Sequence, residues 1–451
     1  MKKIICLGIV LLTLFSCAKD EIKSPKIDYA IPDSLNFTIS NNSLKLIIKN
    51  NSNVLLHFNI NTNNKIFLST LSGDITTGNQ SDLLTTINRA GLVNGKSYFK
   101  LYLTINNIKD SIVIGIDNLK EQKTILNSNV IDAEYSKIKD QLVFVSEYPS
   151  KVNILKSGSD IIQSIPLAYT PTCISISQDG ETAAVGHDGH ITYVNLSTQS
   201  IINTYNVSCF ALDIVLGNNK WAYVFPKENQ WTYIRCVNMN LPTDNEIHDD
   251  ENQIYAGTKA KLDLSGKYIY GANNGLIPSD IEKYDIQNGV AVRLYDSPYH
   301  GDYPMNGNLW LSEDNNRIFT RGETVLNTSS IKSNDMIYNG TITISSDSFS
   351  NIEWLDPSSI KNNLYLIASI GNGWPPVRTP YVYIFDATNL SFKTKIELEK
   401  YVVPNNNGGN TLYEAEPYFV FSNKAGNTLF VITKAIGSGL ANDWAIQKIA
   451  I

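Results

Sequence analysis

Few residues of this chain have the types and spacing that chemistry at a site requires. The chain contains five histidines, at positions 57, 187, 190, 248 and 300, and none belongs to a His-Glu-x-x-His motif. His187-Asp188-Gly189-His190 has the spacing of a metal-binding pair, but Asp-Gly between two strand-like segments is also a hairpin signal, and we interpret it as a turn. Gly437-Ser438-Gly439 lacks the strand-to-helix context of a nucleophile elbow. The sequence therefore predicts no metal site and no cofactor.

The net charge and the motif content argue against several further classes of function. The net charge is −6 and no basic tract is present, which argues against nucleic acid and anionic lipid as partners. No glycine-rich phosphate loop precedes a helix, and no EF-hand series occurs. Carboxylates are plentiful, and an acid–base pair could be assembled from loops that are distant in sequence. A non-catalytic role is the favoured interpretation.

The positive chemical feature is a set of aromatic side chains beside carboxylates and an arginine, in segments expected to be loops. The set comprises Tyr299, His300, Asp302, Tyr303, Trp374, Arg378, Tyr413, Glu414 and Glu416. A planar ring can cover the apolar face of a pyranose while neighbouring polar groups bond its hydroxyls. Two prolines follow Trp374 and stiffen its loop. The pattern favours glycan recognition, although each residue could instead pack between structural elements.

The elements that must position these side chains repeat along residues 122–451. An apolar strand, a polar turn and a second strand rich in Tyr, Val and Ile recur, as in Ile174–Val185 and Leu309–Phe319. The second strands begin near Gln141, Glu181, Lys220, Lys267, Arg317, Asn363 and Asn427. Third strands are expected at Val152–Leu155, Ile191–Leu196, Trp231–Val237, Ile281–Ile286, Tyr381–Phe385 and Trp444–Ile449. A period of about 48 residues is typical of four-stranded blades and predicts an all-β, seven-bladed β-propeller.

Two of these repeats carry a family resemblance. Ser177-Gln178-Asp179-Gly180 and the threonine-containing turns after Asn195 and Asp386 resemble the YVTN-type propeller repeat, which implies the same fold. The last blade lacks an outer strand, because the chain ends after Trp444–Ile449. Residues 122–128 read like the fourth strand Ser200–Tyr205, and we expect them to complete that blade. This closure would remove two exposed sheet edges.

Residues 27–118 are expected to form a separate, small β-unit. Short strands are predicted at Ser34–Ile39, Ser43–Ile48, Val54–Ile60, Leu83–Asn88, Lys96–Ile105 and Ser111–Ile116, with turns rich in Asn and Gly between them. This pattern predicts an immunoglobulin-like sandwich. Leu71-Ser72-Gly73, Asn88–Leu92 and Gly95–Tyr98 resemble the order of motifs in BACON-type modules, which implies the same kind of fold.

The first residues indicate export. Lys2 and Lys3 precede an apolar stretch over residues 4–15 that is too short to span a bilayer and suits a signal peptide. Leu14-Phe15-Ser16-Cys17 resembles the lipobox of bacterial lipoproteins, which implies removal of residues 1–16 and a lipid on Cys17. Residues 17–26 are expected to be a flexible tether. Ala18-Lys19-Asp20-Glu21 resembles the signal that directs Bacteroidetes lipoproteins to the outer face of the outer membrane.

These observations predict an outer-membrane lipoprotein, held by its N-terminal lipid and facing the extracellular side. Its propeller is expected to bind a glycan or another cell-surface component without catalysis. Two alternatives stay open. A propeller hydrolase or lyase would have a compact site of two carboxylates, or of His, Arg and Tyr, at the mouth of the central tunnel that the blades surround. A scaffold that binds only protein would have a flat apolar patch without a groove.

Overall fold

The computed structural model describes residues 26–451 apart from 90, 91, 93, 94, 119–122, 228, 229, 347, 348, 372–376 and 405–409. In this part the regular secondary structure is β-strand apart from one short 3-10 helix, Lys332–Asn334, and no helix has the length and apolar character to cross a bilayer. The chain divides into two compact units, residues 1–120 with 404–410 and residues 121–403 with 411–451. The predicted signal peptide, Cys17, nearly all of the tether and Trp374 lie outside the described residues.

The first unit contains two sheets that share one core. Their strand orders are β1-β3-β7-β5 and β2-β9-β8-β4-β6. The strands are β1 (Tyr29–Ala30), β2 (Ser34–Phe37), β3 (Ser43–Asn50), β4 (Leu56–Asn61), β5 (Ile66–Leu68), β6 (Ser72–Ile75), β7 (Gln80–Ile87), β8 (Gly95–Ile105) and β9 (Ile108–Asn118). Burial alternates along β3 and β4, so one side of each sheet faces the shared apolar core. All six predicted strands are present, whereas the immunoglobulin-like and BACON assignments stay predictions.

The second unit is a series of antiparallel sheets. Its first half contains β11 (Asn129–Ser136), β12 (Gln141–Glu147), β13 (Lys151–Lys156) and β14 (Ile162–Pro166), then β15 (Cys173–Ile176), β16 (Thr182–Gly186), β17 (Asp188–Asn195), β18 (Ser200–Leu216), β19 (Trp221–Pro226) and β21 (Arg235–Asn238), then β23 (Ala260–Leu262), β24 (Tyr268–Gly271), β25 (Glu282–Asp285) and β26 (Val292–Asp296). Between β19 and β23 in the sequence, β20 (Trp231–Thr232) and β22 (Ile254–Tyr255) form a separate two-stranded sheet.

The later sheets continue the same order. They contain β27 (Leu309–Leu311), β28 (Arg317–Thr320), β29 (Thr324–Asn327) and β30 (Tyr338–Thr341), then β31 (Phe349–Ser358), β32 (Asn363–Gly371), β34 (Tyr381–Asp386) and β35 (Phe392–Glu397), then β38 (Glu416–Ser422), β39 (Thr428–Lys434) and β40 (Trp444–Ala450) with β10 (Lys123–Leu126). Short additional strands are β33 (Val377–Arg378), which pairs with β32, and the pair β36 (Tyr401–Pro404) and β37 (Asn410–Tyr413).

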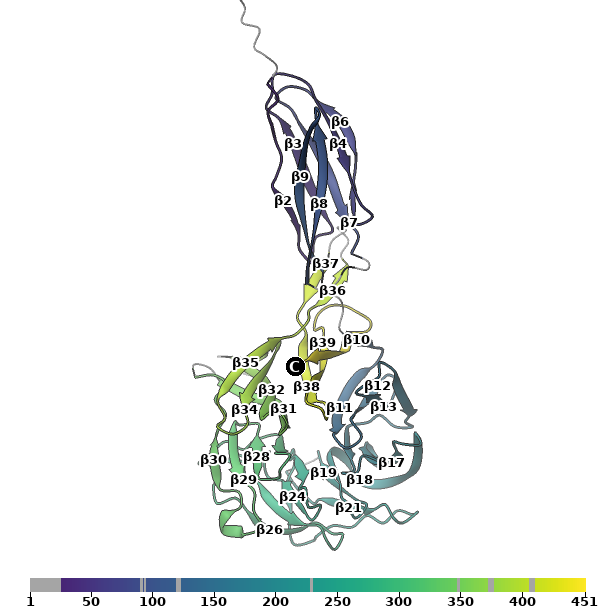
Figure 1. Ribbon diagram of the computed structural model, residues 1–451. Helices are drawn as coiled ribbons and strands as arrows, with labels where there is room; N and C mark the ends of the chain where they lie inside the picture. The colour runs from purple at the N-terminus through teal and green to yellow at the C-terminus, as the bar shows by residue number, and fades with distance from the viewer. Residues whose placement is uncertain are drawn as a thin grey trace, which may run out of the picture. The chain divides into compact units, whose positions relative to one another are not determined.

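The sheets of the second unit are arranged in a ring (Figure 1). The first strand of each repeat contacts the first strand of the next, from β11 through β15, β18, β23, β27 and β31 to β38. This is how the blades of a propeller surround its axis. Every predicted second strand begins within one residue of its expected position, so the repeat in the sequence is the repeat of the fold.

Two strand predictions need correction. The expected third strand Trp231–Val237 is interrupted, because the backbone groups of β20 pair with β22 while β21 pairs with β19. β29, the third strand of its sheet, was not predicted. β18 is one continuous strand that belongs to two successive repeats. It pairs with β17 over residues 200–210 and with β19 over residues 211–216. The number of seven blades therefore stays a prediction.

The predicted closure of the ring is confirmed. β10 pairs antiparallel with β40, from Lys123 opposite Gln447 to Leu126 opposite Trp444. The last and first sheets are also joined where the backbone N–H of Lys424 donates to Asp140 over 2.7 Å. A strand from the start of the ring thus covers the edge of its last sheet.

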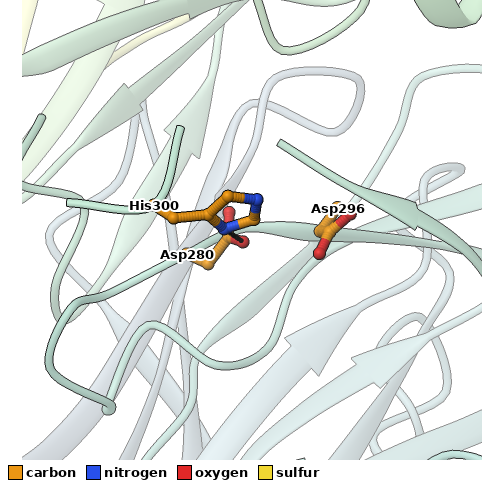
Figure 2. A group of neighbouring side chains, drawn as sticks. All are labelled: Asp280, Asp296 and His300. Carbon is orange, nitrogen blue, oxygen red and sulfur yellow. Dashed lines mark ion pairs between the residues drawn. The ribbon is translucent and has the colours of Figure 1, made fainter. Parts of the chain in front are cut away.

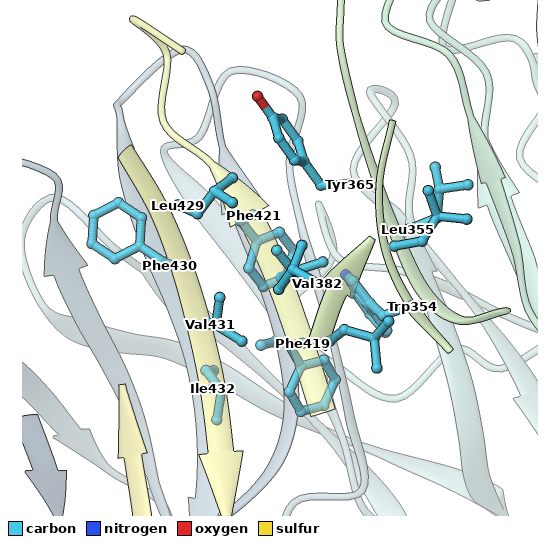
Figure 3. Packing of buried hydrophobic residues seen from close by; sticks show 14 of the residues in the cluster. Trp354, Leu355, Tyr365, Val382, Phe419, Phe421, Leu429, Phe430, Val431 and Ile432 are labelled. Carbon is cyan, nitrogen blue, oxygen red and sulfur yellow. The ribbon is translucent and has the colours of Figure 1, made fainter. Parts of the chain in front are cut away.

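A large apolar core spans this closure (Figure 3). Trp354 of β31 meets Phe419 and Phe421 of β38 edge-on, with ring centroids 4.7 and 5.6 Å apart. The same cluster extends to Phe144 of β12 and Ile446 of β40, both fully buried. Aromatic pairs of this kind stabilise a core beyond the area that they bury. Apolar packing as well as strand pairing therefore holds the ring closed.

Candidate functional site

The first strands run between two opposite faces of the ring. We call one the hairpin face; it is formed by the turns that join first and second strands, at residues 137–140, 177–181, 217–220, 263–267, 312–316, 359–362 and 423–427. We call the other the aromatic face; it is formed by the segments that lead into first strands and those that join second to third strands. Every predicted ligand-binding residue in the described part of the chain lies on the aromatic face.

On the aromatic face, the loop between β26 and β27 gathers four of the predicted residues around a tyrosine stack. Tyr303 stacks on Tyr338 of β30 with centroids 4.3 Å apart and an angle of 8°, and Tyr299 meets Tyr303 edge-on at 4.8 Å. The Tyr299 hydroxyl accepts a hydrogen bond from the backbone N–H of Tyr338 over 3.1 Å. His300 and Asp302 are exposed beside this stack. The stack of Tyr303 on Tyr338 covers one face of each ring. The sequence analysis did not predict Tyr338 as a site residue, because no neighbouring residue in the sequence distinguishes it.

A second group on this face is a network of charges around Arg378. Its guanidinium pairs with Glu416 at 3.4 Å and Glu353 at 3.8 Å, and lies 4.2 Å from the ring centroid of Tyr418. Glu353 also pairs with Arg321 at 2.8 Å. Burial, with Glu416 adding to it, raises the pKa of Tyr418 to about 12. Since these charges are already paired, a ligand here would have to compete with existing contacts.

The remaining predicted residues do not join either group. Glu414 is exposed and pairs with Lys400 at 2.5 Å. Tyr413 is half-buried and packs against the large apolar core. The Tyr299 loop and Arg378 belong to different sheets, so the structure divides the predicted site into separate clusters.

A large hollow lies on the hairpin face. A cavity of 1390 Å³ opens where the first hairpin turns of the sheets converge. Each turn contains one residue with a left-handed backbone: Asp140, Gly180, Lys220, Gly266, Asn315, Asn362 and Gly426. The residue two positions earlier is at the tip of its turn and lines the cavity. We call these residues the turn-tip ring: Ile138, Gln178, Asn218, Leu264, Glu313, Ile360 and Lys424.

The turn-tip ring combines apolar and polar groups at equivalent positions. Ile138, Leu264 and Ile360 are 61, 60 and 62% exposed, which is unusual for aliphatic side chains on polar turns. The Asn218 amide donates to Gln178 over 2.6 Å, and Gln178 donates to the carbonyl of Asp263 over 2.7 Å. Side-chain hydrogen bonds thus link the turns at residues 177–181, 217–220 and 263–267 and hold their tips in place.

The interior beneath these turns carries paired charges. Glu134 accepts the backbone N–H of Ile176 over 2.7 Å and lies 3.5 Å from Lys261. Burial raises the pKa of Glu134 to about 7, although Lys261 and the Ile176 N–H oppose the shift. Lys137 donates to Asp356 over 3.1 Å and to Ser422 Oγ over 2.7 Å. The cavity therefore offers hydrogen-bonding groups without a large charge of one sign.

Sequence reasoning did not identify this cavity. The signal that could have found it is the aliphatic residue within an otherwise polar turn, as in Lys137-Ile138-Lys139 and Ser359-Ile360-Lys361. Aligning the turns of the repeat places these residues at the same position. Only the closed ring shows that the position faces a common hollow.

The turn interpretation of His187-Asp188-Gly189-His190 is confirmed. The backbone N–H of His187 donates to the carbonyl of His190 over 2.9 Å, and Gly189 has a φ of 73°. The buried His187 ring contacts the carbonyl of Thr170 and the hydroxyl of Thr192, at 3.0 and 2.9 Å. Burial lowers the pKa of His187 to about 4. These contacts occupy both ring nitrogens, as a structural histidine requires.

The ring of antiparallel sheets defines a β-propeller protein. A solved structure, the β-propeller domain of Myceliophteria thermophila Cps50 (Swd1), is similar over 73% of this chain and 99% of its own, with a TM-score of 0.51 and 11% sequence identity. Kuenenia stuttgartiensis hydrazine synthase is similar over 74% of this chain and 98% of its own, with a TM-score of 0.46 and 12% identity. No protein-family model and no curated protein matches the chain. At this identity the likeness to the first structure shows the fold alone.

Proposed function

We propose that this protein is a lipid-anchored cell-surface protein whose seven-bladed propeller binds a glycan in the hairpin-face cavity without cleaving it. The β-propeller fold suits a binding or scaffold role. The observation that carries the proposal is the turn-tip ring, in which three exposed aliphatic and four polar side chains surround one hollow. Its equivalent positions on successive turns give a ligand several similar contacts.

The chemistry of the cavity suits a hydroxyl-rich ligand. Its walls include the amides of Gln178, Asn218 and Asn240 and the exposed aliphatic side chains of the turn-tip ring. Amides and carboxylates bond hydroxyls, while aliphatic side chains cover the C–H face of a sugar. The volume exceeds the roughly 300–1,000 Å³ of small-molecule sites, which favours an oligosaccharide or the end of a longer chain.

The aromatic face is the rival location for the same ligand. The prediction from sequence places it at Tyr299, His300, Asp302, Tyr303, Trp374, Arg378, Tyr413, Glu414 and Glu416. Of the described members, the Tyr299–Tyr303 loop is the part best suited to stacking, because Tyr338 enlarges its aromatic surface. Measuring the glycan affinity of variants on both faces therefore decides which of the two locations binds the glycan.

The anchor is the second part of the proposal. We infer that residues 1–16 are a signal peptide and that Cys17 carries the lipid at the outer face of the outer membrane, with the first unit as a BACON-like, immunoglobulin-like spacer. Cys17→Ser removes the thiol that the lipid requires, so the protein should leave the membrane fraction. A variant that still sediments with membranes and carries lipid overturns the anchor.

A glycan array tests the binding function. The purified full chain in detergent should bind a limited set of glycans, and the best of them should titrate to saturation in solution. Binding should leave the glycan intact, as measured by its reducing ends. If the array gives no binding above a heat-denatured sample, glycan recognition fails and the protein scaffold takes its place.

One observation favours a second candidate function, cleavage of a polysaccharide. Glu353 and Glu416 converge on Arg378 beside Tyr418, and this compact group contains the two carboxylates that a catalytic propeller would need. In this case, incubation with the bound glycan should release new ends, and Glu416→Gln should abolish their release. Intact glycan after prolonged incubation excludes this function.

A further inference from the structure

We propose that Asp280, Asp296 and His300 form a binding site for a divalent transition-metal cation, with Zn²⁺ as the probe. The three side chains come from separate segments of the second unit, namely the segment before β25, the end of β26 and the loop that leads into β27 (Figure 2). One ligand atom from each lies within 4.8 Å of the others. This differs from the sequence analysis, which predicted no metal site, because no two of the ligands share a recognisable motif.

The spacing of the ligand atoms fits a single ion. His300 Nδ1 and Asp280 Oδ2 are 3.2 Å apart. With metal–ligand bonds of about 2.1 Å, this separation corresponds to an angle of roughly 100° at the metal, which both tetrahedral and octahedral sites accept. The limit of 4.8 Å slightly exceeds twice that bond length, so Asp296 reaches the same ion after a small side-chain adjustment.

Asp280 is held in the manner of a metal ligand. One of its carboxylate oxygens accepts hydrogen bonds from Ser297 Oγ at 2.5 Å and from the backbone N–H of Ile281 at 2.7 Å. Its second oxygen is the one that faces His300. Such outer contacts fix the direction of a ligating carboxylate. The Asp280 side chain is only 14% exposed, so the surrounding protein restricts its orientation.

The other two ligands are accessible to an incoming ion. His300 is 64% exposed, and the left-handed Gly301 that follows it, with a φ of 109°, lets the loop turn beside Pro278. Asp296 Oδ2 pairs with Arg293 at 2.9 Å, which leaves Asp296 Oδ1 to reach the ion. Arg293 also pairs with Glu282, so the site keeps a net negative charge before metal binds.

The ligand set indicates the class of metal. One imidazole nitrogen with two carboxylates suits Zn²⁺, Mn²⁺ or Co²⁺, whereas Ca²⁺ and Mg²⁺ prefer sites made of oxygen. Three protein ligands leave at least one position for water or a ligand oxygen. The ion would also tie the loop of Tyr299 and Tyr303 to the segment before β25. The site would therefore fix the tyrosine stack on the aromatic face, whether or not a glycan binds there.

Titration of the EDTA-treated full chain with zinc chloride tests the site. Wild type should bind one Zn²⁺ per chain and melt at a higher temperature with zinc than without it. His300→Ala should weaken this binding by about tenfold or more, and Asp280→Asn should do the same. His248→Ala is the matched control, because His248 pairs with the single carboxylate of Asp250 at 3.0 Å.

The results that overturn the proposal are distinct from those that test glycan binding. Zinc binding that is absent in wild type, or that persists unchanged in His300→Ala, contradicts the site. Equal binding of Ca²⁺ by wild type and His300→Ala indicates a carboxylate-only surface and contradicts it as well. His300 is exposed, so its variant should melt like wild type in EDTA; Asp280→Asn keeps the shape of the buried side chain and provides the second measurement.

Discussion

The two faces of the ring use the same fold in opposite ways. On the hairpin face, short turns of nearly constant geometry repeat, and each places one tip residue beside a shared cavity. On the aromatic face, the connecting segments differ in length and sequence, and their side chains pair within one or two neighbouring sheets. The hairpin face is therefore a property of the whole ring, whereas the aromatic face is a set of local clusters.

The difference between the two faces shows how a repeated sequence can form a candidate binding site. A repeat creates a ring of equivalent positions even when no single residue in it is distinctive. Aromatic and charged residues attract attention in a sequence, but Arg378 already forms ion pairs with Glu353 and Glu416 in the structure. Exposed groups at repeated positions are thus more available to a ligand than distinctive groups that are already paired.

The largest effect should come from opening the ring. Deleting residues 123–126 removes β10, unpairs one edge of β40 and takes Leu126 from the core. We expect a loss of roughly 4 kcal/mol in the free energy of unfolding and loss of binding at the hairpin face. Thermal melts should be compared with those of a chain lacking residues 19–25, which should match wild type. Equal melting of the two deletions would refute the role of the closure.

Removing one carboxylate from each face should have unequal effects. Asp356 accepts the backbone N–H of Ser422 at 2.8 Å and pairs with Lys137 at 3.1 Å, and its side chain is 8% exposed. Asp356→Ala should cost about 3 kcal/mol, because it leaves a partly buried lysine and a buried N–H without their partner. Asp302→Ala, on the exposed loop of the aromatic face, should change stability by less than about 0.5 kcal/mol. Denaturant melts measure both, and equal losses would contradict the difference between the faces.

The free energy of unfolding should depend on pH, because Glu134 of the hairpin-face cavity changes its charge. The pKa of Glu134 is raised from 4.5 to about 7, so the folded protein binds this proton more tightly than the unfolded chain. Its contribution to stability is fully present below about pH 4.5 and is lost as the pH rises through 7. Relative to Glu134→Gln, wild type should lose about 2 kcal/mol across this range, after allowing for its partial exposure. Melting curves of wild type and variant that stay parallel from pH 4.5 to 7.5 would rule this out.

Much of the fold could be predicted from the sequence, because strand and turn signals are local. Polar turns fix where second strands begin, and the likeness of residues 122–128 to an outer strand identified the closure at β10. The third strand Trp231–Val237 could not be predicted correctly, since its interruption depends on β22, which is more than a dozen residues away. Local patterns do not show which strand edge a short segment will choose.

Less of the candidate site could be predicted. The gathering of Tyr299 and Tyr303 follows from their closeness in sequence, but their partner Tyr338 comes from another strand of the next sheet. The exposure of Ile138, Leu264 and Ile360 could not be predicted, because an aliphatic residue in a sequence usually indicates a core. Convergence of the turn tips on a cavity is a consequence of closing the ring.

The most direct test of the central claim compares the affinity of the array-selected glycan for variants of both faces. The double variant Leu264→Ser with Ile360→Ser should bind about tenfold more weakly, a change of about 1.4 kcal/mol, and should melt like wild type because both side chains are exposed. Tyr338→Ala and Trp374→Ala should bind within about twofold of wild type. The prediction from sequence gives the reverse, a loss of about 1–3 kcal/mol in Trp374→Ala. Unchanged binding by the double variant together with that loss would contradict a hairpin-face site.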